Sequence, residues 1–310
     1  MIGVLRIIKQ WIRRWEIRSG ECRPNVNKDV YCTLMDGETG ECLFEQNGEK
    51  SALIASVSKI MLAYRQIKLL GTNSSAWQSL QKVGDEVTLA SLGGTGVESN
   101  STVIGRIDGV TRYLQPGDKL TEEGLLYGAL VVSGNDAAAA IASAIDGNEM
   151  TYLARIDETM HRAPFNMSDK SRFGRVYGRD CYSTARDISK AMYTILHDDA
   201  VAPVFWRAAG APSTAGKVEI IKGDGTAVPV ERSNTHPFIG GRYKKYLTRE
   251  IGSVDRICGK TGTWIKDFVL TTAVEHNGKV LIATVLHADN EKKRDDTTLA
   301  LLSWGFKQFD

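Results

Sequence analysis

The clearest hairpin pattern in this 310-residue chain is a pair of apolar, β-rich runs that meet at Asn277-Gly278. An Asn-Gly pair between two such runs is a strong hairpin signal, because both residues tolerate positive φ angles. We therefore predict a hairpin over residues 268–288. A second pair of short strands is predicted over residues 30–47, around a turn that contains glycine.

Helical patterns cover much of the sequence between these strands, with apolar residues recurring at a spacing of three and four. The predicted helices are residues 56–70, a helix beginning at Thr121, and residues 137–145, 151–162, 183–196 and 291–309. After Pro203 the sequence is predicted to be irregular and then β-like. Strands at both ends with helices between them indicate an α/β (α+β) chain whose antiparallel sheet is assembled from both ends. We predict one domain over residues 29–310, with a helical insertion at about 70–250.

Residues 1–28 form a separate segment with a basic amphipathic pattern. Its apolar residues, including Trp11 and Trp15, recur at helical spacing, and arginines and lysine occupy much of the remainder. Such a helix suits a membrane surface, contacted through residues 1–20, but it is also what a first helix packed on the domain would show. Basic residues interrupt the apolar stretch, so we predict neither a secretory signal nor a membrane-spanning helix.

Composition argues against two classes of partner. The formal net charge of +2 is too small to indicate a nucleic acid partner. The five cysteines are scattered and show no metal-ligand spacing with histidine, so we predict no metal and no cofactor. Cys32 and Cys42 flank the first predicted turn, and spacing alone leaves open whether they form a disulfide.

Three short motifs stand in order along the chain. Residues 56–59 read Ser-Val-Ser-Lys, residues 133–135 read Ser-Gly-Asn, and residues 260–263 read Lys-Thr-Gly-Thr. The first motif alone also describes a capping serine followed by a surface lysine, and the other two describe a helix break and a tight turn. All three in this order are typical of penicillin-binding proteins and of class A β-lactamases.

The first motif has a physical interpretation as a nucleophile and its base. A serine hydroxyl needs a base nearby, and helical spacing places Lys59 on the same face as Ser56. Lys59 accepts a proton only as a neutral amine, which burial or a second cation such as Lys260 favours. Ser133 is a candidate proton relay. The backbone N–H groups of Ser56 and Thr263 are candidates for binding an oxyanion.

The third motif is predicted to bind substrate along a strand. Gly262 has no side chain, which lets a substrate backbone approach closely. Lys260, Thr261 and Thr263 supply an ammonium group and two hydroxyls, which together suit a terminal carboxylate.

On these motifs the chain resembles the serine D-alanyl-D-alanine carboxypeptidases, the low-molecular-mass penicillin-binding proteins. LMDGETGECLFEQN is similar to the opening hairpin of that family, ASVSKIMLAY to its nucleophile helix, and PGDKLTEEGLLYGALVVSGNDAAAAIA to its second-motif region. YSTARDISK, SNTHPF and LLSWGF also match family landmarks, so the resemblance covers about residues 30–306. It implies a transpeptidase-like fold of the DD-peptidase and β-lactamase type. That fold has an antiparallel sheet flanked by helices, a helical lobe, and an active site between them.

The resemblance also implies an activity. Ser56 is expected to be the acylated nucleophile and Lys59 its base. Ser133 is expected to line the cleft and take part in catalysis. The residues expected to bind substrate are Asn135, Lys260, Thr261, Gly262 and Thr263. The expected substrate is a peptidoglycan stem peptide ending in D-Ala-D-Ala, with β-lactams as inhibitors. The expected location is the cell envelope or periplasm.

Two alternatives differ from this interpretation. The first is a β-lactamase of the same fold, which would need a glutamate to activate water. No Glu-x-x-Leu-Asn stands between Ser133 and Lys260, and residues 163–173 offer only Asp169. The second is a non-catalytic relative that binds the cell wall or a membrane.

Two positions near the expected site are of special interest. Some family members carry a basic residue just after the last strand, whereas residues 287–289 here read His-Ala-Asp, so carboxylate recognition is expected to differ. His236 in SNTHPF lies in a family landmark, and we predict a structural role for it.

Overall fold

The computed structural model describes residues 23–85, 105–107, 110–112, 114–174 and 180–309, and all structural statements refer to these residues. Nearly all of the predicted N-terminal amphipathic helix lies outside them. Among the described residues, no helix is both long and apolar enough to cross a membrane.

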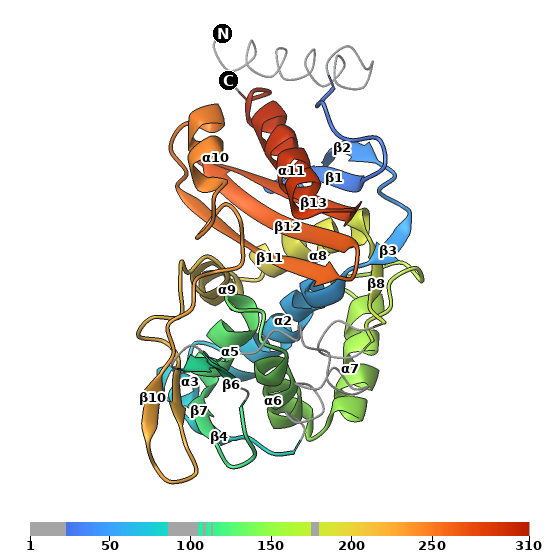
Figure 1. The fold of residues 1–310 in the computed structure, drawn as a ribbon. Coiled ribbons are helices and arrows are strands. Elements are labelled where there is room, and N and C mark those ends of the chain that lie inside the picture. The colour runs from blue at the N-terminus through green and yellow to red at the C-terminus, as the bar shows by residue number, and fades with distance from the viewer. Residues whose placement is uncertain (1–22, 86–104, 108–109, 113, 175–179, 310) are drawn as a thin grey trace.

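A five-stranded antiparallel sheet forms one half of the molecule, in the order β11-β12-β13-β1-β2 (Figure 1). Strand β1 pairs with β13 along its whole length, so segments near the two ends of the chain meet inside the sheet. This arrangement confirms the predicted antiparallel sheet. The strands are β1 (Tyr31–Asp36), β2 (Cys42–Gln46), β11 (Arg256–Trp264), β12 (Asp267–His276) and β13 (Lys279–Ala288).

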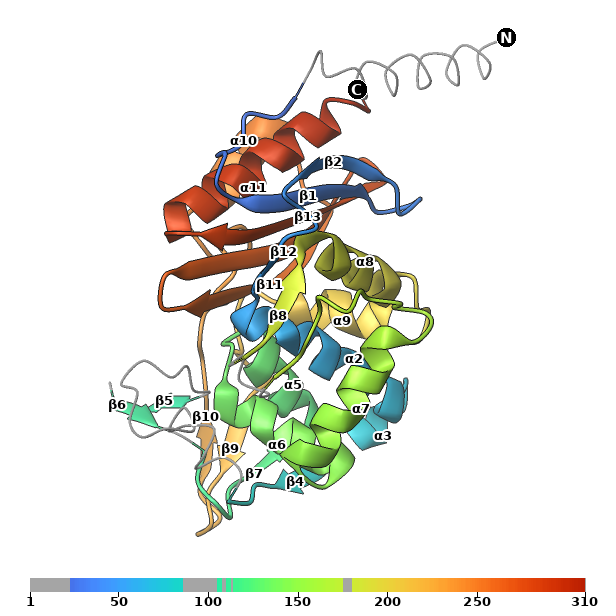
Figure 2. The same cartoon turned by 90° about the vertical axis from the view of Figure 1, so that its right-hand side faces the viewer.

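The turn between β12 and β13 is the hairpin that the sequence predicts. Asn277 and Gly278 have φ angles of 51° and 70°, and two consecutive positive φ angles match the twist of paired strands. The middle residues of both strands are buried, because helices cover both faces of the sheet. Figure 2 shows α10 (Lys244–Ile251) and α11 (Glu291–Phe306) on one face and α8 (Ala185–Leu196) on the other.

A helical lobe forms the other half, with α2 (Lys59–Leu70) near its centre. Helix α2 is largely buried and packs against α5, α6, α8 and α9, which is why its sequence is apolar over most of its surface. Helix α7 packs on α6. The lobe consists of the 3-10 turn η1 (Ala55–Ser58), α2, α3 (Ser74–Trp77), α5 (Glu122–Leu130), α6 (Asn135–Asp146), α7 (Glu149–His161) and α9 (Ala202–Ala209).

Small antiparallel sheets complete the described part of the chain. One joins β3 to β8, another joins β5 to β6, and a third has the order β10-β9-β7-β4. Their strands are β3 (Ser51–Leu53), β4 (Leu80–Lys82), β5 (Gly105–Ile107), β6 (Val110–Arg112), β7 (Lys119–Thr121), β8 (Tyr182–Thr184), β9 (Glu219–Ile221) and β10 (Ala227–Pro229).

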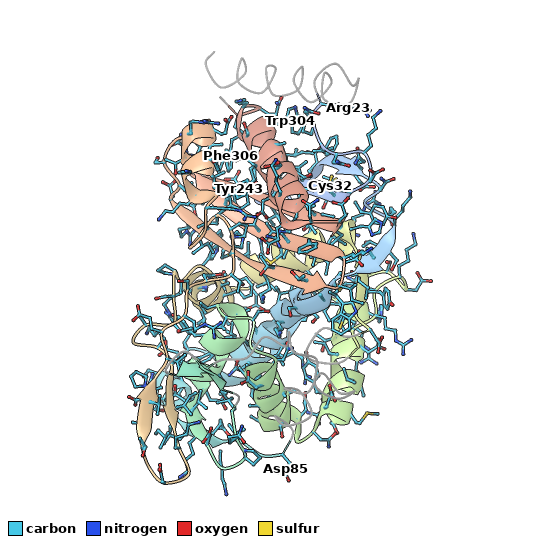
Figure 3. The ribbon with its side chains drawn as sticks, viewed as in Figure 1. Arg23, Cys32, Asp85, Tyr243, Trp304 and Phe306 are labelled. Atoms are coloured by element: carbon cyan, nitrogen blue, oxygen red, sulfur yellow. The ribbon has the colours of Figure 1, made fainter. Side chains whose placement is uncertain are left out.

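The core consists of two apolar clusters, one on each face of the large sheet. The larger cluster fills the helical lobe and extends to the sheet face that β11 to β13 turn toward α2 and α8. The smaller cluster lies between the sheet and helices α10 and α11. Figure 3 labels four of its members: Cys32, Tyr243, Trp304 and Phe306. Burial of apolar side chains on both faces stabilises the packing of the sheet against the helical lobe and against α10 and α11.

Among the described residues, three helices were not predicted: α3, α9 and α10. For α9 and α10, the expectation of irregular and then β-like structure after Pro203 is wrong. Helix α9 contains Pro203 in its first turn, where proline is tolerated because its missing N–H would have no helical partner. Helix α10 has only eight residues, and most of them are exposed, so its sequence carries a weak apolar pattern. Short helices of this kind depend on tertiary packing more than on their own sequence.

Candidate active site

Ser56 and Lys59 lie at the start of the central helix of the lobe. Ser56 sits in the 3-10 turn η1, and Lys59 is the first residue of α2. Residues three apart eclipse each other in a 3-10 turn, which aligns the two side chains. Lys59 Nζ is 2.9 Å from Ser56 Oγ, and Lys59 is only 1% exposed. The sequence-predicted pair is therefore in direct contact.

The other partners of Lys59 come from the second motif. Its ammonium group donates to the Ser133 carbonyl oxygen at 2.8 Å and to Asn135 Oδ1 at 2.7 Å. Burial lowers the pKa of Lys59 to about 7, while the charge of Asp136 acts in the opposite direction. A large fraction of the amine is thus neutral at physiological pH.

The same contacts orient the neutral amine. A neutral amine has two N–H donors and one lone pair, and both the Ser133 carbonyl and Asn135 Oδ1 can only accept hydrogen bonds. The two N–H groups are therefore committed to these oxygens. The lone pair is left facing Ser56 Oγ, so the geometry suits removal of the hydroxyl proton.

Two residues beside this pair have strained backbones. Ala55 has a φ angle of 44° and Ser133 a φ angle of 67°, although neither is glycine. Such conformations cost on the order of 1–3 kcal/mol each and persist only where the surrounding structure enforces them. At Ser133 the conformation directs the carbonyl oxygen to Lys59. The contact between these two residues runs through that carbonyl, so the predicted relay by the Ser133 hydroxyl stays a prediction.

Residues 260–263 lie on β11, the edge strand that faces the helical lobe (Figure 1). A Cβ at Gly262 would lie 3.1 Å from Ser56 N and 2.7 Å from the Ile54 carbonyl oxygen. The absence of a side chain at Gly262 thus lets β11 pack against the 3-10 turn that carries Ser56. From the sequence, the same absence was expected to let a substrate backbone approach the strand. The close approach brings Thr263 near the turn that carries the Ser56 N–H.

Lys260 is the second buried amine of the site, at 1% exposure, and its Nζ donates to the Thr261 carbonyl oxygen at 2.8 Å. Burial is the first cause that holds its pKa well below the usual value, and the charges of Lys59 and Arg294 add to the effect. From the sequence, burial or a second cation such as Lys260 was expected to lower the pKa of Lys59. In the structure, burial is the main cause of the lowered pKa of Lys59. The repulsion between the two amines contributes to the lowered pKa of Lys260.

Sequence reasoning missed several residues that support the site. Thr235 Oγ1 lies 2.9 Å from Thr261 Oγ1, and the SNTHPF landmark was the signal that could have identified it. Asp136 is fully buried and accepts N–H groups from Leu114 and Ala137. Arg294 is buried although its surroundings, residues 291–296, read as a charged helix surface.

Other predicted positions have clear places in the structure. His236 is buried, and burial lowers the pKa of its imidazole to about 3, in line with a structural role for a neutral ring. His287 Nδ1 lies 3.0 Å from Asp267 Oδ1. Cys32 and Cys42 are free thiols, because Cys32 faces Gln46 and Cys42 faces Met35 across the strand pair. In the described ranges, no group of three or more His, Cys, Asp or Glu side chains could hold a metal ion.

Comparisons with known proteins agree with this geometry. The family described as Peptidase_S11, D-alanyl-D-alanine carboxypeptidase, matches residues 22–208. The D-alanyl-D-alanine carboxypeptidase DacF of Bacillus subtilis is 24% identical over 279 residues, which are 89% of this chain and 62% of DacF. DacC of Escherichia coli is 25% identical over 292 residues, 93% of this chain and 63% of DacC. The chain thus spans less than two thirds of the length of these curated relatives.

Solved structures share the fold. The DD-transpeptidase of Streptomyces K15 is similar with a TM-score of 0.73 and 20% identity, over 92% of this chain and 99% of that chain. Penicillin-binding protein 6B of Escherichia coli is similar with a TM-score of 0.70 and 23% identity, over 92% of this chain and 78% of that chain. These likenesses establish the sheet and helical lobe as a known architecture.

Proposed function

The chain belongs to the D-alanyl-D-alanine carboxypeptidase family, and we propose that it is a serine D-Ala-D-Ala carboxypeptidase. The observation that carries this proposal is the buried amine of Lys59, 2.9 Å from Ser56 Oγ, with its pKa lowered to about 7. The proposed substrate is a peptidoglycan stem peptide that ends in D-Ala-D-Ala. We expect β-lactams to inhibit the enzyme, because they present a reactive carbonyl and a carboxylate to the same groups.

Acylation begins when Ser56 Oγ attacks the carbonyl carbon of the penultimate D-alanine. Neutral Lys59 takes the hydroxyl proton as the new C–O bond forms. The N–H groups of Ser56 and Thr263 bind the oxyanion of the tetrahedral intermediate. The C–N bond then breaks, and the leaving amine of the terminal D-alanine receives the proton from Lys59, with the Ser133 hydroxyl as relay. D-Alanine departs and an ester remains on Ser56.

Deacylation uses the same groups with water as the nucleophile. Lys59, neutral again after giving up its proton, takes a proton from water as the water oxygen attacks the ester carbonyl. The ester C–O bond breaks, and Ser56 recovers its hydroxyl proton from Lys59. With a β-lactam, the leaving amine stays attached after ring opening. The adduct therefore shields the ester from water and persists.

Substrate binding is assigned to the third motif and its neighbours. Lys260, Thr261 and Thr263 hold the terminal carboxylate of the substrate, and Thr235 orients the Thr261 hydroxyl from 2.9 Å. Asn135 fixes Lys59 and lines the site. His287 Nδ1 contacts Asp267 and not the third motif. We therefore assign binding of the substrate carboxylate to residues 260–263.

The remaining expectations complete the proposal. We assign the catalytic domain to residues 29–310, and we expect it to work in the cell envelope, where peptidoglycan is found. Residues 1–20 are proposed to contact a membrane surface. Loss of vesicle binding in a chain without residues 1–20 would support that contact, and unchanged binding would exclude it. For the β-lactamase alternative, the acid considered in residues 163–173, Asp169, is exposed, which does not favour a role in activating water beside Ser56.

Mass spectrometry tests the proposal directly. The chain is incubated with a diacetylated Lys-D-Ala-D-Ala peptide and, separately, with penicillin. We expect release of D-alanine in the first case and a stable adduct on Ser56 in the second. Ser56→Ala should remove both signals, and labelling that persists in this variant would contradict the serine mechanism. Rapid turnover of penicillin would favour the β-lactamase alternative.

A further inference from the structure

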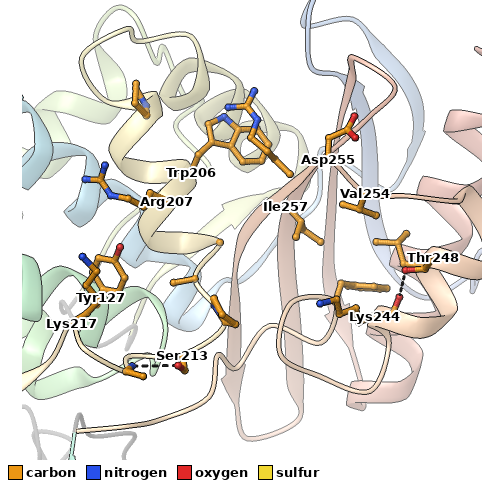
Figure 4. A pocket seen from close by; sticks show the side chains of 18 residues that line it. Tyr127, Trp206, Arg207, Ser213, Lys217, Lys244, Thr248, Val254, Asp255 and Ile257 are labelled. Atoms are coloured by element: carbon orange, nitrogen blue, oxygen red, sulfur yellow. Dashed lines mark hydrogen bonds between the residues drawn. The ribbon is translucent and has the colours of Figure 1, made fainter. Parts of the chain in front are cut away.

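A cavity of about 830 Å³ is lined by residues other than those that carry the proposed reaction. Figure 4 shows it between α9, the loop that follows α9, α10 and the first residues of β11. None of the residues of the three motifs lines it. Its volume falls within the range of roughly 300–1,000 Å³ that is common for small-molecule sites.

A short segment separates this cavity from the candidate active site. Thr235 faces the site through its contact with Thr261, and a Cβ at Gly259 would meet the His236 ring at 2.8 Å. Phe238, two residues further on, lines the cavity instead. The cavity and the reaction centre therefore lie on opposite sides of residues 235–238.

The cavity is mainly apolar. Aromatic rings come from Tyr127 on α5 and Trp206 on α9, and aliphatic side chains from Leu247 on α10 and Ile257 on β11. Figure 4 shows Trp206 and Ile257 on facing elements of the lining. Side chains of this kind suit the aromatic or aliphatic body of a ligand, whose burial they would favour.

Cationic side chains also line the cavity. Four cationic residues from four different segments contribute to the cavity, against one carboxylate, that of Asp255: Arg207, Lys217, Lys244 and Arg256. Lys217 pairs with Glu123 at 3.1 Å, and Arg256 Nε donates to Glu275 at 2.6 Å. Within the described part of the chain, no carboxylate lies within ion-pair distance of Arg207 or Lys244.

Two of the four cationic side chains also lie over aromatic rings of the cavity. The Arg256 guanidinium is 4.7 Å from the centre of the Trp206 ring, and Lys217 Nζ is 5.6 Å from that of Tyr127. Charge and apolar surface are thus adjacent, which is the arrangement that binds a ligand with an anionic end and an apolar body.

We propose that this cavity is a second binding site, for a small amphipathic anion. The ligand class is a molecule with one aromatic ring system or a short alkyl chain and one carboxylate or sulfonate group. The anion meets Arg207 and Lys244, and the body lies between Trp206 and Ile257. Binding here does not require the reaction at Ser56, so the site stands independently of the proposed function.

Fluorescence titration of the full chain with 8-anilinonaphthalene-1-sulfonate tests the site, since this aromatic sulfonate has the required chemistry. Trp206→Ala should weaken binding by about tenfold, as expected for loss of a central aromatic contact. Arg207→Gln and Lys244→Gln should each weaken it by roughly three- to fivefold. Lys190→Gln, an exposed lysine on α8 outside the cavity, is the matched control and should change nothing. Equal affinity in all four variants would overturn the proposal, as would no binding up to millimolar dye.

Competition separates charge recognition from simple apolar binding. Decanoate should displace the dye, whereas decyltrimethylammonium at the same submicellar concentration should not. Equal displacement by both would exclude recognition of the anion. Chain that has been acylated by penicillin should bind the dye with unchanged affinity, and a loss of affinity would mean that the dye occupies the catalytic region. Since the readout is dye fluorescence, the titration of the variants and the displacement by decanoate do not depend on enzyme activity; only the acylated sample requires the reaction at Ser56.

Discussion

The rate of acylation should rise with pH through the pKa of Lys59. Only the neutral amine accepts the Ser56 proton, and burial lowers the pKa of Lys59 to about 7. With that value, roughly a tenth of the amine is neutral at pH 6 and about nine tenths at pH 8. The second-order rate constant for acylation by a fluorescent penicillin should therefore increase about tenfold between these pH values. A normal lysine would give its increase near pH 10 instead.

A variant of the neighbouring carboxylate provides the control. The charge of Asp136 raises the pKa of Lys59, so Asp136→Asn should move the midpoint of the pH profile to a lower value. Stopped-flow measurements between pH 5 and 9 would give both midpoints. A flat profile for the native chain, or a midpoint that rises in Asp136→Asn, would refute the assignment of Lys59 as a neutral base.

Three further changes have defined outcomes. Gly262→Ala should lower the acylation rate by at least about tenfold and reduce the melting temperature, because the added Cβ meets the Ile54 carbonyl oxygen at 2.7 Å; Gly223→Ala, which enters open space, should do neither. Thr235→Val removes the hydroxyl that contacts Thr261, so KM for the peptide should rise by roughly three- to tenfold with a smaller change in kcat; an altered kcat alone would contradict a role in binding. In Lys59→Met the stability gain relative to the native chain should be larger at pH 6 than at pH 9, as measured by urea unfolding. The lowered Lys59 pKa means that the unfolded state binds more protons between about pH 7 and the normal lysine pKa, so native stability rises with pH in that window; the opposite trend would show that Lys59 is not destabilised by burial.

The elements that were predicted correctly carry strong local signals. The hairpin at Asn277-Gly278 depends on the φ preferences of two adjacent residues, and it formed where expected. The contact between Ser56 and Lys59 follows from a three-residue spacing, which brings the side chains together in a 3-10 turn as well as in an α-helix. In both cases the sequence spacing was sufficient to predict the contact, although Ser133 and Asn135, more than 70 positions away, also hold Lys59 in place.

The features that were missed depend on distant neighbours. Gly262 packs against residues 54–56, which are about 200 positions away in sequence, so a strand pattern could not reveal the contact. Arg294 stands in a run of charged residues that reads as exposed, yet it is a buried residue of α11 whose charge acts on Lys260. Helix α9 has too few residues for its apolar pattern to stand out beside Pro203. The contact of Gly262, the burial of Arg294 and the formation of α9 thus all depend on tertiary packing.

The pairing of β1 with β13 has a consequence for how the chain acquires its structure during synthesis. The partners Thr33 and Thr284 are about 250 residues apart in sequence, a separation that belongs to slow, non-local folding. At roughly 5–20 residues per second, ribosomes need on the order of 10–50 s to make the segment between them. Until β13 has been made, the edge of β1 that pairs with it has no partner strand. Early termination before residue 279 would leave that edge exposed for good, so truncated products should be prone to aggregation.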